Sequence, residues 1–569
     1  MKPNAKIDMH SFIKMIRAEK RAEYSRYRGE VDAPLSQVCD SADALGPLIL
    51  KQKLGFARWV LEGKACYSRF RPGDTVEIRL QKAGSDLSVK FSDGWRVETV
   101  RYSEPGKIEV TVGGIKPLEE EDIREVFLFK SSSSVFNNLL MKKIYEMGSS
   151  TAPILLNSGG RYPLSVEGAN FRRIYDGLND IQKNAVHQLI GDDMNGAVQG
   201  PPGTGKTQLL QAIIALALNS KMKVCVTSFT NAAVDNLLAR VVRENPDYDW
   251  VRVGNSDKIR GEFYTQNEGS AAVSSPDFKK SLDEYQLLGA TLHKLAFNRS
   301  APKVDLLVVD EAGQVPVYFW PFIQRLTRRL ILVGDQFQLP PVLSAKHADI
   351  QYDNIFSLFV GEDTPMLETQ YRMRREIQAW SSEKFYKGRL VPHVSVVNRD
   401  YFAQSPAFLT DDFVVPKRFS SGSSGKFSQK EADFITDKVE RIMKSRDNAE
   451  TVGVICPYRI QAGIVNAALQ NRLGTTAASK VLVDTVERFQ GQEREAIFLS
   501  FGGDGGSSED LHFLSDIRRL NVAVTRAKSR FFCLYDEKLV ENAVASQSEE
   551  LAEFLSWLKD RRTYIRRAA

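Results

Sequence analysis

The amino-acid sequence predicts an α/β fold with two domains, each built on a parallel sheet with helices on both faces, and a small N-terminal β-barrel on a helical stalk. Two observations predict the sheets. Short continuous apolar segments alternate with helical stretches from about residue 162 onward, and these segments fall into two sets. A third observation predicts the barrel, because period-two alternation recurs between turn residues in residues 68–130.

The composition is that of a globular protein in aqueous solution. The chain has 569 residues, of which 43% are hydrophobic and 26% charged, so a large core can be buried. The longest apolar stretch, residues 213–218, is far shorter than the roughly 20 residues that cross a bilayer. The charged N-terminus lacks the apolar segment of a secretory signal. We therefore expect a protein that is not secreted, has no membrane partner, and works in the cytoplasm or, in a eukaryote, the nucleoplasm.

Cysteines, histidines and net charge narrow the class of protein only slightly. The five cysteines are scattered singly, and the six histidines show no metal-ligand spacing. This pattern predicts no structural zinc and suits a reducing compartment. The formal net charge of +6 permits a polyanionic partner but does not identify one.

Residues 1–67 are expected to form the helical arms of the stalk. A charged segment with Phe12, Ile13 and Ile16 on one side predicts a helix at about residues 9–27, and a second helical stretch is predicted at about 48–62.

The barrel is predicted at residues 68–130, where segments such as FRPGDTVEIRL and KIEVTV alternate apolar and polar residues between glycine and proline turns. Residues 131–160 are expected to return along the stalk, with a helix at about 135–147. A β domain with no special role is the competing interpretation.

The first α/β domain is predicted at residues 161–345, with a small polar insertion at about 255–287, and the second at residues 346–545. Residues 546–569 are expected to form a C-terminal helix. The predicted strands of the first domain are GAVQ (196–199), KVCVTS (223–228), LLVVDE (306–311) and LILVGD (330–335). Those of the second are VGVICPY (452–458), KVLVDTV (480–486), AIFLSF (496–501) and RFFCLYD (530–536).

The strongest chemical signal is GPPGTGKT, residues 200–207, which follows a predicted strand and precedes a predicted helix. In this P-loop pattern, glycines let successive backbone N–H groups curl around a phosphate. Lys206 adds a positive charge at the β and γ phosphates, and the Thr207 hydroxyl can ligate Mg²⁺. The pattern predicts a site for a nucleoside triphosphate, with ATP and Mg²⁺ as the cofactors. The other expected phosphate-site residues are Gly200, Gly203, Thr204 and Gly205.

Two further segments supply the groups that hydrolysis needs. Asp310 and Glu311 end a predicted strand, so they should lie beside the P-loop at the carboxyl edge of the sheet. Asp310 would hold the Mg²⁺ ion, and Glu311 would polarise the attacking water. Gln338 follows the next predicted strand and could sense the γ-phosphate through hydrogen bonds.

Arginines further along the chain are candidates for stabilising charge on the γ-phosphate. Tyr371 and Arg372 lie in LETQYRMRREI, and Arg526 lies in RRLNVAVTRAKSR. Guanidinium groups perform this task in phosphoryl transfer. Nothing in the composition places these residues at the P-loop.

Taken together and in order, the motifs resemble those of superfamily 1 helicases, in the 5′-to-3′ branch that includes the nonsense-mediated-decay helicase. The resemblance runs from about residue 178 to residue 528 and implies two RecA-like P-loop domains. The motifs are LNDIQKNAV, GPPGTGKT, TSFTNAAVDNLL, GATLHKL, VVDEAGQ, LVGDQFQLPPV, LETQYRMRREI, VICPYRIQ, VDTVERFQGQE and LNVAVTRAK.

The resemblance implies a role for each matching residue. Gln182 would read the adenine edge, Tyr371 would stack on the base, and Glu493 would lie near the ribose. Arg372 and Arg526 would reach the γ-phosphate from the second domain. The residues implied to line single-stranded DNA or RNA are Thr230, Asn231, Thr291, Pro341, Tyr458, Gln461 and Thr485.

Three functions remain open at this point. The first is a translocating helicase that moves 5′-to-3′, with ATP hydrolysed between the two domains. The second is an ATP-gated clamp or remodeller of nucleic acid without processive unwinding. The third, a ring-forming P-loop ATPase, has a single α/β core, so the second set of predicted strands counts against it. Neither DNA nor RNA is favoured, because phosphate and stacking contacts serve both.

Overall fold

The computed structural model describes the chain between residues 9 and 559, with gaps. Within that range the description leaves out residues 41–42, 56, 66–67, 69, 105–106, 115–124, 132–133, 147–163, 191–195, 245–246, 255–271, 274–284, 298–302, 328, 346–352, 404–411, 421–425 and 447–448. The chain divides into two compact units. The first comprises residues 1–22, 134–372 and 385–395, and the second comprises residues 23–133, 373–384 and 396–569.

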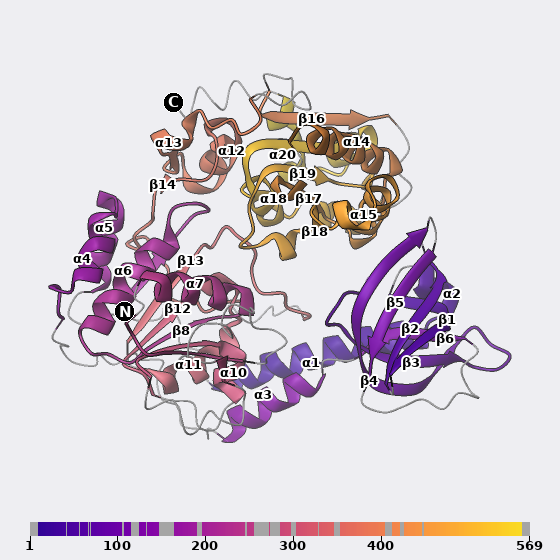
Figure 1. The fold of residues 1–569 in the computed structure, drawn as a ribbon, viewed down its shortest axis with the longest axis horizontal. Coiled ribbons are helices and arrows are strands. Elements are labelled where there is room, and N and C mark those ends of the chain that lie inside the picture. The colour runs from indigo at the N-terminus through magenta and orange to yellow at the C-terminus, as the bar shows by residue number, and fades with distance from the viewer. Residues whose placement is uncertain are drawn as a thin grey trace. The chain divides into compact units, whose positions relative to one another are not determined.

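The second unit contains a closed antiparallel barrel with the strand order β1-β2-β5-β4-β3-β6 (Figure 1). The strands are β1 (Ala44–Gly55), β2 (Arg58–Lys64), β3 (Thr75–Gln81), β4 (Ser88–Glu104), β5 (Lys107–Gly113) and β6 (Val126–Lys130). Its interior is filled by buried apolar side chains that include Trp59, Val76, Trp95 and Leu128. The predicted barrel is therefore confirmed, but it starts at Ala44 rather than at residue 68.

The helix predicted at residues 48–62 is wrong, because this segment forms the hairpin of β1 and β2. Leu48 and Leu61 face the barrel core from the two strands. The apolar Ile49 next to Leu48 is 60% exposed, and this extra apolar residue obscured the period-two alternation. Gly55, a poor helix former, ends β1 at the hairpin.

The helices before and after the barrel are confirmed as α1 (Met9–Asp32) and α3 (Ser134–Glu146), and a short α2 (Leu35–Asp40) follows α1. In the first unit, Phe12, Met15 and Ile16 of α1 pack in one buried cluster with Leu140 and Ile144 of α3. The apolar stripe of α1 is thus buried, as its sequence pattern predicts.

The first unit is built on a seven-stranded sheet with the order β10-β9-β11-β8-β12-β13-β7, in which neighbouring strands pair in parallel. The strands are β7 (Gly196–Gln199), β8 (Val224–Ser228), β9 (Trp250–Val253), β10 (Ala272–Val273), β11 (Leu287–Thr291), β12 (Leu306–Val309) and β13 (Leu330–Gly334). The four predicted strands are confirmed as β7, β8, β12 and β13. Strands β9, β10 and β11 were not predicted. Gly289 weakens the strand pattern of β11, and an added Cβ there would lie 2.7 Å from Leu238.

Both faces of this sheet are covered. Val224 and Val226 pack into one buried cluster with helical residues such as Leu210, while Cys225 between them packs into another with residues such as Phe319. The helices of this part of the chain are α4 (Ala169–Asp176), α5 (Asp180–Leu189), α6 (Lys206–Asn219), α7 (Asn231–Glu244), α10 (Leu292–Phe297) and α11 (Trp320–Leu326), with 3-10 turns η4 (Ala312–Gln314) and η5 (Val317–Phe319).

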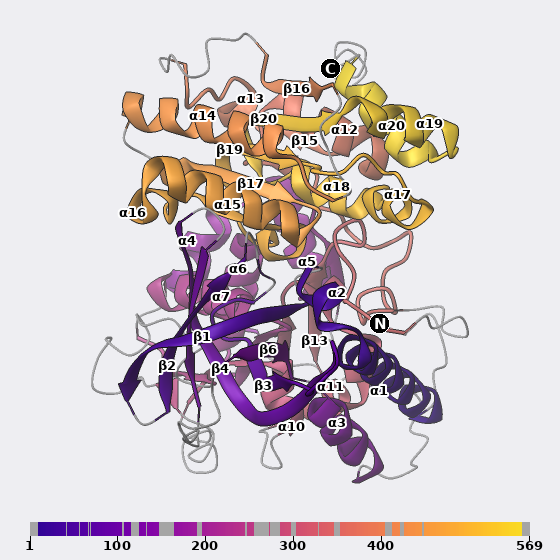
Figure 2. The same cartoon turned by 90° about the vertical axis from the view of Figure 1, so that its right-hand side faces the viewer.

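The second unit contains a separate five-stranded parallel sheet with the order β16-β20-β19-β17-β18. The strands are β16 (Val414–Phe419), β17 (Val452–Cys456), β18 (Leu482–Thr485), β19 (Arg494–Ser500) and β20 (Ala527–Asp536). Helices α14 (Gln429–Arg446) and α15 (Arg459–Leu473) lie side by side along one face of this sheet (Figure 2), where Ile435 and Val465 share a buried cluster with Val454 and Phe498. All four predicted strands are confirmed, and β16 was missed.

The remaining elements follow residue 368. They are β14 (Thr369–Gln370), α12 (Arg375–Tyr386), β15 (Val391–Pro392), α13 (Val394–Val397), α14 (Gln429–Arg446), η7 (Ala449–Thr451), α15 (Arg459–Leu473), α16 (Thr475–Ala478), η8 (Val486–Phe489), α17 (Ser508–Leu514), α18 (Ile517–Val524), α19 (Glu537–Ala545) and α20 (Glu549–Lys559). Among the described residues, no helix is long and apolar enough to cross a membrane.

Two parallel sheets confirm the predicted pair of α/β domains and exclude a chain with a single α/β core. The predicted division at residues 345–346 adjoins residues 346–352, which lie outside the described residues, as does most of the predicted insertion at 255–287. Residues 353–372 group with the first unit.

Candidate functional site

The predicted P-loop connects the C-terminal end of β7 to the first turn of α6. Gly203 and Gly205 have φ values of 77° and 78°, which only glycine adopts readily. Lys206 and Thr207 begin α6, so their backbone N–H groups belong to the unpaired donors at the helix N-terminus. The loop therefore has the conformation and the helix end that bind a phosphate group.

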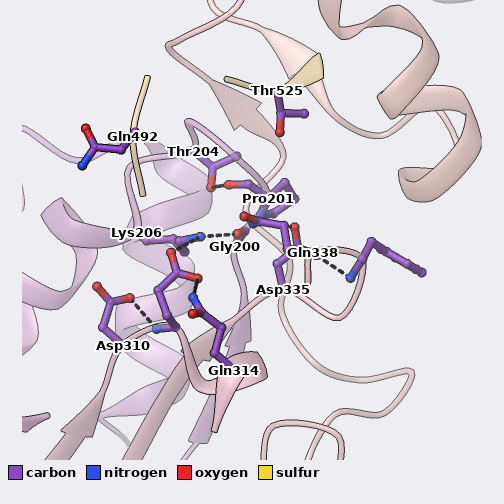
Figure 3. Close-up of polar contacts among 12 residues, drawn as sticks. Gly200, Pro201, Thr204, Lys206, Asp310, Gln314, Asp335, Gln338, Gln492 and Thr525 are labelled. Carbon is purple, nitrogen blue, oxygen red and sulfur yellow. Dashed lines mark hydrogen bonds and ion pairs between the residues drawn. The ribbon is translucent and has the colours of Figure 1, made fainter. Parts of the chain in front are cut away.

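Lys206 lies between the P-loop and the two acidic residues Asp310 and Glu311 (Figure 3). Its Nζ atom donates to the carbonyl of Gly200 at 3.0 Å and lies 3.6 Å from Oε1 of Glu311. The loop itself is fixed by the Thr204 hydroxyl, which donates to the carbonyl of Pro201 at 2.7 Å. A triphosphate could replace these oxygens as the partner of the ammonium group, because the side chain already extends along the inside of the loop.

Asp310 and Glu311 follow β12 at the same edge of the sheet. Asp310 is buried, and one of its oxygens accepts a hydrogen bond of 2.9 Å from the N–H of Glu311. Glu311 adopts a left-handed conformation with φ 52°, which is uncommon for a residue with a Cβ and is typical of functional sites. Burial raises the pKa of the Asp310 carboxyl, the charge of Glu311 raises it further, and Lys206 lowers it.

A second buried carboxylate, Asp335, holds the predicted sensor Gln338. Asp335 follows β13 and accepts hydrogen bonds from the Gln338 amide at 2.9 Å, the Tyr386 hydroxyl at 2.7 Å, the Gln199 amide at 3.3 Å and the Phe337 N–H at 3.1 Å. Burial raises the pKa of Asp335 above its ordinary value, although Lys206 and the donors from Tyr386, Gln338 and Phe337 lower it. The sequence analysis missed Asp335, yet the signal was present: it occupies the same position after its strand as Asp310.

Replacing Tyr386 by Phe is expected to lower the free energy of unfolding by about 1–3 kcal/mol, because a buried carboxylate loses a donor. Urea unfolding of the full chain measures the change. The matched control is Tyr24→Phe, at a tyrosine that is 52% exposed, which should change stability by less than about 0.5 kcal/mol. Equal stability of the two variants would contradict this account of Asp335.

The predicted reader of adenine, Gln182, is engaged within the protein. It is 2% exposed; its Oε1 accepts from the N–H of Asn179 at 3.0 Å, and its Nε2 donates to the carbonyl of Thr204 at 3.0 Å. Gln182 thus completes the capping box at the start of α5, and its amide also joins α5 to the P-loop. In this conformation Gln182 braces the loop, and its role at the adenine edge stays a prediction.

Tyr371 and Arg372 lie beside the P-loop in the first unit. The Tyr371 N–H donates to the carbonyl of Gly203 at 2.8 Å, and an added Cβ on Gly203 would lie 2.6 Å from Cβ of Arg372. The chain around Leu367 exchanges backbone hydrogen bonds with Gln199 at the end of β7, and residues up to Arg372, the last of this segment, group with the first unit. The predicted approach of Arg372 to the γ-phosphate from the second domain stays a prediction. Of the two predicted arginines, only Arg526 belongs to the second unit.

Four of the residues that were predicted to contact single-stranded nucleic acid lie in the first unit. Thr230 and Asn231 follow β8, and Thr291 ends the neighbouring strand β11, so these three lie at the same edge of the sheet. Thr230 is exposed, whereas Thr291 and Pro341 are buried. Only part of the predicted set is therefore accessible in this conformation.

A buried ion pair that was not predicted from the sequence holds the side chain of Asn231 in place. Arg252 and Asp235 are 0% and 2% exposed, and their Nε and Oδ1 atoms are 2.6 Å apart. The same guanidinium donates to Oδ1 of Asn231 at 2.9 Å. The residue types are common, and their pairing depends on β9 and α7 meeting in the fold, so the sequence alone carries no signal for it.

The predicted contacts of the second unit also lie at one sheet edge, because Tyr458 follows β17 and Thr485 ends its neighbour β18. Tyr458 donates to Asp510 at 2.9 Å and stacks on Phe513. Glu493 pairs with Lys528 at 2.6 Å.

Arg526 is 2% exposed. Its guanidinium donates to the Val522 carbonyl at 3.1 Å, to the Gln492 carbonyl at 3.4 Å and to the Thr525 hydroxyl at 3.2 Å. All of these contacts lie within the second unit, and the contact of Arg526 with the γ-phosphate stays a prediction.

Gln461 is fully buried in this conformation, and its contact with a nucleic-acid strand stays a prediction. Its amide donates to the Ser428 carbonyl at 3.2 Å and to the Ser500 hydroxyl at 2.9 Å. The Ser500 hydroxyl in turn donates to Glu431 at 2.6 Å, and the N–H of Gly502 donates to the same carboxyl. Gln461 is thus part of a buried polar network that fixes the loop after β19.

This network makes stability depend on pH through Glu431. Burial raises the pKa of Glu431 from 4.5 to about 8, and the charge of Asp536 raises it too, while donors from Ser500 and Gly502 lower it. Because the folded state holds this proton more tightly than the unfolded state, the contribution is complete below pH 4.5 and is lost as the pH rises to about 8. Urea unfolding of the parent and Glu431→Gln proteins at both ends of this range tests it: the parent should lose more stability at high pH, and parallel profiles would contradict the assignment.

Basic side chains of the barrel lie close to the predicted strand contacts of the second unit. Arg71 of the barrel forms an ion pair with Asp484, the residue before Thr485. Burial lowers the pKa of Arg71, Asp484 opposes this, and the positive charges of Arg459 and Arg488 lower it further. The same unit therefore gathers several positive charges beside Thr485.

Comparisons with known proteins extend these observations. Two family models, both described as an AAA domain, match residues 177–346 in two overlapping pieces and residues 353–538. Together these ranges cover more than half of the chain.

Two curated relatives are DNA replication ATP-dependent helicase/nucleases. The chain is 28% identical over 395 residues to JHS1 of Arabidopsis thaliana and 27% identical over 408 residues to DNA2 of Mus musculus. Each alignment covers 63% of this chain, but only 28% and 37% of the respective relatives. The chain thus spans well under half of the length of these relatives.

Among solved structures, the arterivirus nonstructural protein 10 (helicase) matches 86% of this chain and 79% of its own, with 14% identity and a TM-score of 0.37.

Proposed function

The chain belongs to the superfamily 1 helicases, and from this premise we propose that it is an ATP-dependent translocase or helicase acting on single-stranded nucleic acid. The family predicted from the ordered motifs is thus confirmed. The observation that carries the proposal is the meeting of Lys206, Asp310, Glu311 and Gln338 around one P-loop at the carboxyl edge of one parallel sheet.

The proposed reaction is hydrolysis of the γ-phosphate of ATP. Lys206 would bind the β and γ phosphates, Glu311 would accept a proton from the attacking water, and Gln338, held by Asp335, would contact the γ-phosphate. The raised pKa of buried Asp310 beside Glu311 fits a divalent cation, because a positive ion would relieve the repulsion between two adjacent carboxylates. Thr207 and Asp310 would hold Mg²⁺, which would supply charge neutralisation at the transferred phosphoryl group.

The family resemblance supports further roles that we propose for the two arginines and for the strand. Arg372 and Arg526 would neutralise charge on the γ-phosphate, and Glu493 would lie near the ribose. Binding and release of the γ-phosphate would then change how the two units engage a strand. The direction of movement, 5′-to-3′, is proposed from the same resemblance.

The strand would be held through phosphates and stacking rather than through base edges. Exposed Thr230, the partly exposed Asn231 and the basic side chains beside Thr485 support this mode of binding. The names of the two relatives favour DNA as the substrate.

The test is steady-state ATP hydrolysis by the full chain with no nucleic acid, with single-stranded DNA and with single-stranded RNA. We expect hydrolysis to rise with single-stranded DNA and the stimulation to fall with added salt, because phosphate contacts release counterions. A rate of ATP hydrolysis that neither single-stranded DNA nor single-stranded RNA changes would contradict the proposal.

A further inference from the structure

Tyr371 and His393 form an aromatic pair beside the P-loop. Their ring centroids are 4.6 Å apart and their planes are tilted by 36°, so the imidazole covers one face of the phenol ring. Both residues are partly exposed and belong to the first unit. The family motifs include Tyr371 but not His393.

The pair is held by backbone structure on both sides. The short parallel strands β14 and β15 bring the two segments together, and the N–H of His393 donates to the carbonyl of Gln370 at 2.9 Å. An ion pair between Arg389 and Glu368 joins the same two segments next to these strands. The imidazole Nδ1 also lies 2.8 Å from the Ser395 hydroxyl. The position of His393 therefore depends on several contacts rather than on the ring contact alone.

Tyr371 is fixed at two further points. Its backbone N–H donates to the carbonyl of Gly203 in the P-loop, and its hydroxyl accepts from Nδ2 of Asn179 at 2.8 Å. Asn179 also caps α5 through the N–H of Gln182. The plane of the phenol ring is thus set relative to the phosphate loop before any nucleotide binds.

We propose that His393 is a positioning residue of the nucleobase site, covering one face of Tyr371 so that the base of a nucleoside triphosphate stacks on the other face. A third ring cannot enter between the two rings at a centroid distance of 4.6 Å, since it would need ordinary stacking contact on both sides. The covered face is therefore closed, and the other face is the one left for a base. This inference rests on the proposed function, because it requires a triphosphate at the P-loop.

The experiment compares two ligands that share the triphosphate chain and differ in the nucleoside, which carries the base. ATP carries the base, whereas inorganic tripolyphosphate carries only the phosphate chain, and each is titrated as a competitor of a fluorescent ATP analogue on the full chain. In the His393→Ala protein, the affinity for ATP should fall about three- to tenfold, the range for loss of an aromatic pair, while the affinity for tripolyphosphate stays unchanged. His393→Phe should restore binding of ATP, because a planar ring again covers Tyr371.

The matched control is His187→Ala. His187 also contacts a tyrosine, Tyr175, with ring centroids 5.8 Å apart, but on the exposed surface of α5. It should change neither affinity. Equal weakening of both ligands in His393→Ala, or no change in either, would overturn the role of His393. If the parent protein binds neither ligand, the proposed function itself is wrong, which is a separate and recognisable outcome.

Discussion

The Lys206→Ala protein is expected to lose ATP hydrolysis by at least about a hundredfold, as when one preorganised donor is removed from developing negative charge. The Nζ atom of Lys206 already lies within 3.6 Å of Glu311 and 3.0 Å from the Gly200 carbonyl, at the centre of the phosphate loop. Both binding and hydrolysis should suffer, because the ammonium contacts the triphosphate before and during the reaction. Steady-state hydrolysis with saturating single-stranded DNA measures the loss.

The fold should survive this change, since Lys206 pairs with groups at the edge of the sheet rather than in its core. The matched control is Lys444→Ala, at a lysine side chain that is 74% exposed and forms an ion pair one helical turn from Glu440. It should hydrolyse ATP at the parental rate. A Lys206→Ala protein that matched this control would show that the P-loop is not the site of hydrolysis.

The second large effect is expected for Glu311→Gln, which should lower kcat by about 10²- to 10⁴-fold, the usual contribution of a general base. The amide has nearly the same shape as the carboxylate and can keep the left-handed backbone of this position, so the site should remain intact. ATP affinity should be retained or increased, because one negative charge near the triphosphate is removed. A protein that binds ATP but barely hydrolyses it is the expected phenotype.

Equilibrium binding of ATP and single-turnover hydrolysis, measured on the same preparation, separate these two effects. Glu440→Gln is the control, since Glu440 of α14 pairs with Lys444 and with Arg472 of α15, away from the P-loop. Hydrolysis by Glu311→Gln at the parental rate would rule out Glu311 as the base and direct attention to Asp335.

The sequence was sufficient for the phosphate site because its parts are local. The residues of the P-loop are consecutive, and Asp310 and Glu311 follow directly on a buried strand, so their positions follow from the rule that parallel strands end at one edge. Short apolar strands were equally readable, as β7, β8, β12 and β13 show.

Contacts between segments that are distant in the sequence could not be predicted from it. The hydrogen bond between Tyr386 and Asp335 joins residues 51 positions apart, and the one between Gln461 and Ser500 joins residues 39 apart. Neither has a spacing that a single sequence reveals. The buried amides of Gln182 and Gln461 illustrate the limit, since a motif names the residue but only the fold shows whether its side chain faces the solvent.

The wrong prediction of a helix at residues 48–62, where β1 and β2 form a hairpin, has a different cause. At residues 48–62 the period-two pattern of the barrel interior is overlaid by exposed apolar residues such as Ile49 and Leu54. Burial in the closed barrel, rather than local preference, decides the structure there.

ATP hydrolysis at Lys206 and Glu311 is expected to drive movement along one nucleic-acid strand in one direction. Strand displacement tests it most directly, with duplexes that carry a single-stranded tail at either the 5′ or the 3′ end, and with Glu311→Gln as the control. The account predicts displacement from the 5′-tailed duplex only, with ATP and not without it, and none by the control. Stimulated hydrolysis with displacement of neither duplex would contradict the motor and leave an ATP-gated clamp.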